Sequence, residues 1–221
     1  FTVALSGGST PKALFRLLAG EGDGSFRGRV PWNRAQVFWG DERHVPPDHP
    51  DSNYRMTYDT LLSRVPVPPE NIHRIRTEDP DADKVAESYE RTLRSVFRLA
   101  EGQLPRFDLV LLGMGPDGHT ASLFPGTPAL HERKRLVVGQ WVEKLQTHRI
   151  TLTPPVLNNA ALVVFLVSGA EKAETLRAVL LGEYQPERFP AQLVRPTGGR
   201  LLWLVDRAAA RGLQHPGEGN D

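Results

Sequence analysis

The sequence predicts a single α/β domain, residues 1–221, built around a mostly parallel sheet. Short apolar runs alternate with amphipathic helical patterns from end to end, and no linker or repeat divides the chain. Most of the apolar runs carry too few polar residues to face water on one side, which favours strands buried on both faces. The expected strands are Thr2–Leu5, Gln36–Trp39, Asn71–Ile75, Asp108–Leu112, Leu136–Val142, Leu162–Val167 and Leu201–Val205.

Helices are expected between these strands, where apolar residues recur at i, i+3 and i+4. Thr10 followed by Pro11 predicts an N-cap and a first turn, Asp51–Ser52 caps the next helix, and Pro80–Asp81 opens a long charged one. The helical segments are Pro11–Leu18, Ser52–Leu62, Asp81–Leu99 and Ala170–Leu181, with surface loops at Gly20–Asn33 and Val65–Glu70 and a frayed tail at His215–Asp221.

The composition excludes several classes of function. The 27 Lys and Arg residues nearly balance the 26 Asp and Glu, so no global field favours nucleic acid or an anionic membrane. The absence of cysteine excludes disulfides, thiolate metal sites and a cysteine nucleophile. No apolar run approaches the roughly 20 residues of a membrane span, so we expect a cytoplasmic protein, and we expect a monomer. Because Phe1 falls inside a strand pattern, a short segment is expected to precede it.

The segment from Phe107 to Thr120 carries the most information about function. An apolar strand runs into a glycine-rich turn that presents Asp117 and His119, which is how α/β enzymes display catalytic groups. Its glycines also spell G-x-G-x-x-G, but Pro116 and Pro125 leave no room for the long helix that a dinucleotide site needs. A catalytic Asp–His pair is therefore favoured over a nicotinamide or flavin site and over a plain tight turn.

The first strand ends in Ser6-Gly7-Gly8-Ser9-Thr10 directly before a helix. Free backbone N–H groups, hydroxyls and the helix dipole then converge on one point, which predicts a phosphate site. The lysine of a Walker A loop is absent, which argues against nucleoside triphosphates. Helix capping alone would explain Thr10 but not the paired glycines.

A second strand ends in an acidic and basic cluster that includes Asp41 and Arg43. Nearby carboxylates and imidazoles raise the alternative of a divalent metal site, but their spacing fits no common ligand pattern and Arg43 would repel a cation. We therefore expect no metal and interpret Asp41 and Arg43 as a pair directed at a polar substrate. The cluster comprises Asp41, Glu42, Arg43, His44, Asp48, His49 and Asp51.

Two later cations, Arg149 and Lys172, fall where strands and helices meet. Either can close on a phosphate, and a solvated surface charge is the equally weighted alternative. No G-x-S-x-G elbow exists, so a serine-hydrolase mechanism with Ser6 or Ser9 as nucleophile has no support.

Taken together, these motifs resemble the 6-phosphogluconolactonase family in residue type, order and spacing. The resemblance runs from the first strand to at least Lys172, without a large insertion. It implies a modified doubly wound, Rossmann-like fold with a mostly parallel sheet and helices on both faces, shared with the glucosamine-6-phosphate deaminases. The pieces that carry it are Leu5–Pro11, Trp39–Arg43, Ser52–Tyr54, Phe107–Gly126 and Arg149–Thr153.

The deaminases are the main rival within this resemblance. Their pattern has a glutamate shortly after the Asp-Gly-His turn, where this chain has Phe124, and an aromatic residue where it has Arg43. Both positions favour the lactonase. A non-catalytic sugar-phosphate sensor is the third alternative, although no helix-turn-helix or basic module is visible.

The resemblance implies hydrolysis of 6-phospho-D-glucono-1,5-lactone to 6-phosphogluconate, in the oxidative pentose phosphate pathway, without metal or redox cofactor. We expect His119 to be the general base, Asp117 to orient it, and Arg43 to stabilise the oxyanion or the sugar hydroxyls together with backbone groups of the turn. These groups should converge on one cleft at the carboxyl ends of the strands. The expected substrate-binding residues are Ser6, Gly7, Gly8, Ser9, Thr10, Asp41, Gly113, Gly115, Arg149 and Lys172.

Overall fold

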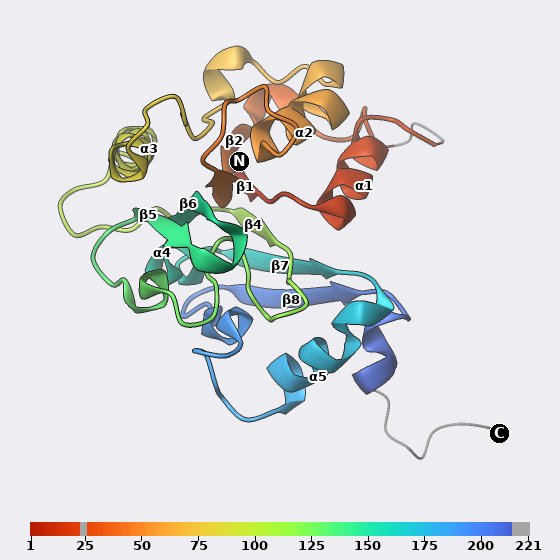
Figure 1. Cartoon of the computed structure of the whole chain (residues 1–221). Coiled ribbons are helices and arrows are strands. Elements are labelled where there is room, and N and C mark those ends of the chain that lie inside the picture. The colour runs from red at the N-terminus through yellow and green to blue at the C-terminus, as the bar shows by residue number, and fades with distance from the viewer. Residues whose placement is uncertain (23–25, 214–221) are drawn as a thin grey trace.

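The computed structural model describes residues 1–22 and 26–213 and contains two sheets of different type (Figure 1). The larger sheet has five strands, all parallel, in the order β2-β1-β4-β7-β8. The smaller is antiparallel, in the order β3-β6-β5. The strands are β1 (Thr2–Leu5), β2 (Gln36–Trp39), β3 (Asp41–Arg43), β4 (Leu109–Leu112), β5 (Val137–Val142), β6 (Thr147–Leu152), β7 (Leu162–Val167) and β8 (Arg200–Val205).

Helices pack around both sheets. Together with the parallel order of the larger sheet, this confirms the predicted α/β class and the mostly parallel central sheet. In Figure 1, α1 and α2 lie above strands β7 and β8, and α5 lies below them. Helix α3 packs against β5 and β6 of the smaller sheet. The α-helices are α1 (Ser9–Leu18), α2 (Asn53–Thr60), α3 (Ala82–Phe97), α4 (Pro154–Asn158) and α5 (Ala173–Leu181).

The strand order places a topological switch point beside β1. From β1 the chain crosses to β2 on one side, whereas β4, β7 and β8 extend the sheet on the other. In open α/β sheets the crevice outside the carboxyl ends of the strands at such a point is the usual ligand site. The segments that emerge there are the glycine-serine loop after β1 and the Asp-Gly-His turn after β4.

The core is continuous beneath this edge. Phe38, Trp39, Tyr89 and Phe107 are almost completely buried. The hydroxyl of Tyr89 donates to the Trp39 carbonyl at 3.0 Å and accepts from the Trp39 N–H at 2.9 Å, and the Trp39 indole N–H donates to Thr57 at 3.2 Å. These bonds fix the end of β2, from which the chain passes through Gly40 into β3.

Several sequence predictions of local structure are wrong. Residues 71–75 form no strand: Pro69–Asn71 is a 3₁₀ turn, and Ile72 makes only an isolated bridge to Val37. Strands β3 and β6 were not expected, and the expected strand at 136–142 exists but runs antiparallel in the smaller sheet. Strand β8 is not buried on both faces, since Leu201, Leu202 and Leu204 are exposed.

The helix starts were mostly predicted well. Ser52 accepts from the Arg55 N–H and Asp81 from the Asp83 and Lys84 N–H groups, as expected of N-caps. Thr10 is not a cap: α1 begins at Ser9 after Gly8, and the Thr10 hydroxyl is 2.7 Å from that of Ser168. The predicted tail at 215–221 and part of the 20–33 loop lie outside the described residues. Among the described helices, none is long and apolar enough to cross a membrane.

Candidate active site

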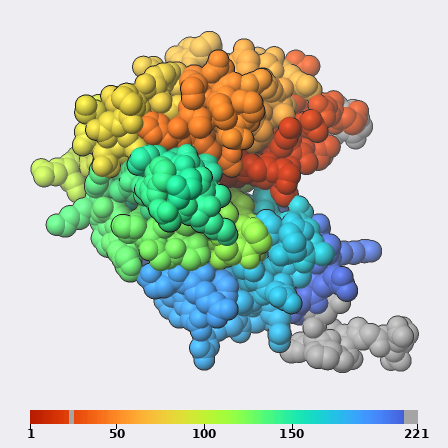
Figure 2. Space-filling model, in the orientation of Figure 1, coloured from red at the N-terminus to blue at the C-terminus, as the bar shows by residue number. Residues whose placement is uncertain are grey.

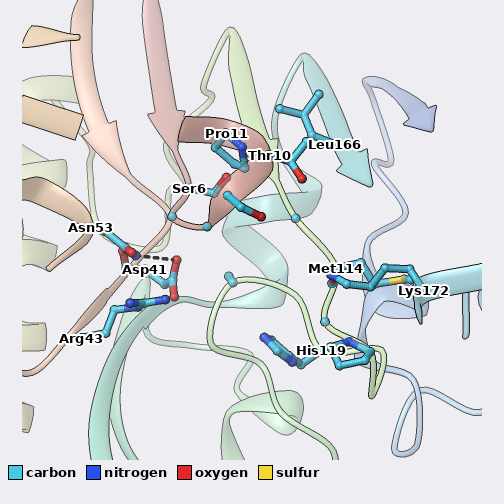
Figure 3. Close-up of a pocket in the computed structure, with 17 residues that line it drawn as sticks. Ser6, Thr10, Pro11, Asp41, Arg43, Asn53, Met114, His119, Leu166 and Lys172 are labelled. Atoms are coloured by element: carbon cyan, nitrogen blue, oxygen red, sulfur yellow. Dashed lines mark hydrogen bonds between the residues drawn. The ribbon is translucent and has the colours of Figure 1, made fainter. Parts of the chain in front are cut away.

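The loops at the switch point enclose a cavity of about 250 Å³ (Figure 3). In Figure 3, Ser6 and Thr10 face His119 across the cavity, and Asp41 and Arg43 lie on the opposite side from Lys172. An adjoining cavity shares Asp41, Arg43 and His119 with the first and is also lined by Asp117, Lys144 and Arg149. The glycine-serine loop, the Asp41–Arg43 segment, the Asp-Gly-His turn and Arg149 therefore line two adjoining cavities.

The glycine-serine loop turns sharply between β1 and α1. Gly8 has φ +105°, a conformation that favours glycine, and this lets the chain turn directly from β1 into α1. A Cβ on Gly7 would overlap the buried side chain of Asn53 at the start of α2. The Ser6 hydroxyl is buried and has no hydrogen-bond partner among the described residues. The N-terminus of α1 and an unsatisfied hydroxyl thus face the same cavity.

His119 and Asp117 form a hydrogen-bonded pair. Asp117 Oδ1 lies 2.5 Å from His119 Nδ1, and because an ionised carboxylate only accepts, Nδ1 carries the proton. In the neutral form of the ring, this tautomer leaves the lone pair on Nε2. Burial raises the pKa of Asp117, but hydrogen bonds from His119 and Lys144 outweigh burial and hold it well below its usual range. The pair is an ionised carboxylate that holds Nδ1 of the imidazole.

The turn that carries this pair uses two of its backbone amides internally. The Gly115 N–H donates to the His119 carbonyl at 2.9 Å and the Gly118 N–H to the Gly115 carbonyl at 3.0 Å. Both amides are therefore used within the turn and are not free to bind an oxyanion. Gly113 and Gly115 still line the cavity, and a Cβ on Gly115 would overlap the imidazole of His119.

Strand β3 separates the acidic cluster into two parts. Asp41 faces the cavity, accepts from the Ser122 hydroxyl at 2.7 Å, and receives the Asn53 amide on its backbone carbonyl at 3.0 Å. Glu42 points the other way and accepts from the N–H groups of Asn53 at 2.7 Å and Tyr54 at 2.8 Å, at the N-terminus of α2. Burial raises the pKa of Glu42 despite these bonds.

The remaining members of that cluster do not gather around the cavity. His44 bonds to the Asp79 carbonyl at 2.7 Å, and His49 pairs with Asp51 at 3.8 Å, both in partly exposed positions. Within residues 1–22 and 26–213 no three His, Asp or Glu side chains are grouped so as to hold a metal ion.

The cations Arg149 and Lys172 are placed differently. Lys172 lines the cavity with the glycine-serine loop and donates to the Met114 carbonyl at 2.5 Å. Arg149 lies opposite Arg43 in the β3–β6 ladder and lines the adjoining cavity. Its Nε and Nη1 are buried without a partner among the described residues, and burial, with the charge of Arg43, lowers its pKa. The structure does not bring Arg149 and Lys172 into the same cavity.

Comparison with known proteins places this geometry in a family. The model for glucosamine-6-phosphate isomerases/6-phosphogluconolactonase matches residues 1–203. The chain belongs to this family. A 6-phosphogluconolactonase of Synechocystis sp. is 46% identical over 214 residues, covering 96% of this chain and 85% of the relative. One from Rattus norvegicus is 42% identical and covers 99% and 82%.

Solved structures agree with the family assignment. The 6-phosphogluconolactonase of Trypanosoma brucei has a TM-score of 0.82 at 33% identity, over 97% of this chain and 86% of that one. A monomeric glucosamine-6-phosphate deaminase has a TM-score of 0.78, over 96% and 87%, but its 22% identity shows only that the fold is shared.

The sequence analysis did not assign three residues to the site that the structure places there. Asn53 lines the cavity from α2, Lys144 donates to Asp117 from the β5–β6 turn, and Phe124 stacks on His119 with ring centroids 4.2 Å apart. Phe124 therefore occupies the position where the deaminase members of the family were expected to carry a glutamate. Only the Ser-Asn-Tyr motif gave a signal for Asn53, and nothing in the sequence signalled the contact of Lys144.

Proposed function

We propose that this chain is a hydrolase that converts 6-phospho-D-glucono-1,5-lactone to 6-phosphogluconate in the pentose phosphate pathway, with His119 as general base. The single observation that carries the proposal is the Asp117–His119 pair, which lies across one cavity from the glycine-serine loop. The names of the relatives, at 46% and 42% identity over nearly the whole chain, supply the substrate.

His119 carries the proton through both steps of the reaction. Its Nε2 removes a proton from water as the water oxygen bonds to the lactone carbonyl carbon, which leaves a tetrahedral oxyanion. When the bond between that carbon and the ring oxygen breaks, the same proton passes from Nε2 to the ring oxygen. Asp117 stabilises the intervening imidazolium.

Arg43 is the proposed oxyanion partner. The Gly115 and Gly118 amides are used within their turn, whereas Arg43 lines both cavities beside His119 and carries a permanent charge. Asp41 is held by Ser122 and is suited to accept from sugar hydroxyls. We place the substrate phosphate on Ser6–Thr10, with Lys172 beside it, and keep Arg149 as a second phosphate ligand.

We propose a reaction that needs neither cofactor nor metal, because the imidazole of His119 can activate water without them. The proposal of metal independence rests on Arg43, whose positive charge lies beside Asp41 in the cavity and would repel a cation. Dialysis against EDTA is expected to leave the rate unchanged. Loss of activity that a divalent ion restores would return the Asp41 region to consideration as a metal site.

Product analysis tests the function directly. The enzyme is supplied separately with the phosphorylated lactone and with glucosamine 6-phosphate, and acid release and ammonia are measured. Acid from the lactone, above spontaneous hydrolysis, supports the lactonase. Ammonia supports the deaminase, and sugar-phosphate binding without turnover supports the sensor. His119→Ala should lose about 10²–10⁴-fold in rate while it still binds 6-phosphogluconate.

A further inference from the structure

The tip of the β5–β6 hairpin reaches the catalytic turn through one side chain. Lys144 Nζ donates to Asp117 Oδ2 at 2.9 Å, while Oδ1 of the same carboxylate holds His119 Nδ1. Figure 2 shows this hairpin standing out from the face of the molecule that it occupies. Lys144 also lines the cavity that contains Arg43, Arg149 and His119.

We infer that Lys144 is a positioning residue for the reaction, acting on His119 through Asp117; this rests on the lactonase function proposed above. A carboxylate that is held at one oxygen only can rotate and take the imidazole with it. With both oxygens engaged, Asp117 fixes the plane of the ring and the direction of Nε2. Catalytic groups need such fixation because small misplacements cost much of the rate.

The hairpin tip holds the backbone of Lys144 in place before any substrate binds. Glu143 accepts from the Trp141 indole N–H at 2.7 Å and from the Gln146 amide at 2.7 Å, and the Gln146 N–H donates to the Glu143 carbonyl at 3.2 Å. Gln146 completes the turn with φ +50°. These bonds hold the exposed turn between β5 and β6 in one conformation, so that the Lys144 side chain extends to Asp117 from a fixed backbone position.

Stability does not account for this contact. The Lys144 side chain is 66% exposed, and ion pairs with such exposure contribute little to folding. Asp117 is only 22% exposed, so the ordered partner is the catalytic carboxylate rather than the lysine. The effect of Lys144 should therefore appear in the rate and not in the melting temperature.

A direct contact of Lys144 with the substrate phosphate would predict a different kinetic pattern. Such a contact would raise KM for the phosphorylated lactone and spare unphosphorylated glucono-1,5-lactone. A positioning role lowers kcat for both substrates by the same factor, because the imidazole acts on the ring ester that they share. A fall in kcat on both lactones therefore indicates positioning, whereas a higher KM for the phosphorylated lactone alone indicates contact with the phosphate.

The test compares Lys144→Met, Lys144→Arg and the control Lys134→Met, which removes the same charge at an exposed position outside both cavities. We expect Lys144→Met to lower kcat about tenfold on both lactones, with KM and the melting temperature little changed. Arg should restore most of the rate, and Lys134→Met should match the wild type. A KM effect limited to the phosphorylated lactone, or an unchanged kcat, would overturn the inference.

A spectroscopic measurement on the free enzyme keeps this test separate from the proposed function. The Nδ1 proton of His119, assigned by its loss in His119→Ala, should be protected from exchange in the wild type and broadened by exchange in Lys144→Met. Equal protection in both proteins would refute the positioning role, even if no lactone were hydrolysed. A wild type that fails to turn over the lactone while the proton responds as expected would refute only the lactonase function.

Discussion

The ring of Phe124 stacks on the imidazole of His119, with centroids 4.2 Å apart and planes inclined by 23°. Phe124 is 6% exposed, so the imidazole rests against a buried, rigid surface. Asp117 and Phe124 therefore restrain the same ring, one by a hydrogen bond in its plane and the other by contact with its face. Phe124 thus gives the imidazole an apolar support, which suits the single proton carrier that we propose.

Replacing Phe124 by Leu tests this support. The smaller side chain loses the stack, so kcat should fall several-fold while KM changes little, and the lost packing should lower the free energy of unfolding by about 1 kcal/mol. Phe124→Tyr keeps the ring and serves as the control. Steady-state kinetics and urea denaturation measure the two effects. A Leu variant with the kcat of the wild type would show that the stack has no part in catalysis.

Asp117→Asn tests the orientation of the imidazole. An Asn side chain can donate to Nδ1 and so favour the tautomer that has no free Nε2, which should lower kcat by about 10²–10⁴-fold with binding of 6-phosphogluconate retained.

The pH dependence of kcat that Asp117 causes has a defined sign. Because the pKa of Asp117 is held well below its usual range, Asp117 becomes protonated only at a pH below the range in which an ordinary aspartate titrates. Above about pH 5 the ratio of wild-type to variant kcat should not reflect titration of Asp117. A titration of the wild type in that range that disappears in the Asn variant would contradict this assignment.

The sequence predicted the parallel strands well because their signal is local. The apolar runs at β1, β2, β4, β7 and β8 lie within one residue of the observed strands. Strands β3 and β6 carry polar residues such as Asp41 and Arg149, and they pair with each other from opposite halves of the chain, so no local pattern marks them. The expected strand at 71–75 failed because its apolar residues pack without a ladder after Pro68 and Pro69.

In the candidate site, too, the sequence predicted the contacts within short motifs and missed those between distant segments. The Asp117–His119 pair and the Ser6–Thr10 loop lie within short motifs, so their chemistry could be proposed from spacing. Thr10 was misassigned as a cap because its hydroxyl bonds to Ser168, 158 residues away. Lys144 reaches Asp117 across 27 residues, through a hairpin whose pairing the sequence did not indicate.

Gly7 is expected to tolerate no side chain. A Cβ there would overlap Asn53, which is 2% exposed and donates to the Asp41 carbonyl, so it has no free space into which to move. Gly7→Ala should therefore lower the free energy of unfolding by about 1–3 kcal/mol and raise KM, because the anion loop shifts with it. Gly28→Ala is the matched control, since a Cβ at Gly28 meets nothing within 4 Å. Denaturation curves and KM values for the two variants decide the matter, and equal behaviour would refute the close approach.

Recognition of the phosphate is tested by neutralising Lys172 and Arg149 in turn. Lys172 shares the cavity of the glycine-serine loop, and two buried nitrogens of Arg149 have no partner among the described residues. A dianionic phosphate can satisfy such groups, and a charge-assisted hydrogen bond contributes about 1.5–3 kcal/mol. Lys172→Gln and Arg149→Gln should therefore raise KM for the phosphorylated lactone roughly ten- to a hundredfold, with a much smaller change for glucono-1,5-lactone.

A comparison of the two variants locates the phosphate. Lys172 and Arg149 line different cavities that share His119, and Lys172 lines the one that contains the glycine-serine loop, so a phosphate on that loop lies nearer to Lys172. If only Lys172→Gln distinguishes the two lactones, Arg149 acts with Arg43 at the reacting end of the substrate, because its effect then follows the ester that both lactones share. Equal effects of Lys172→Gln on both lactones would move the phosphate away from the loop after β1.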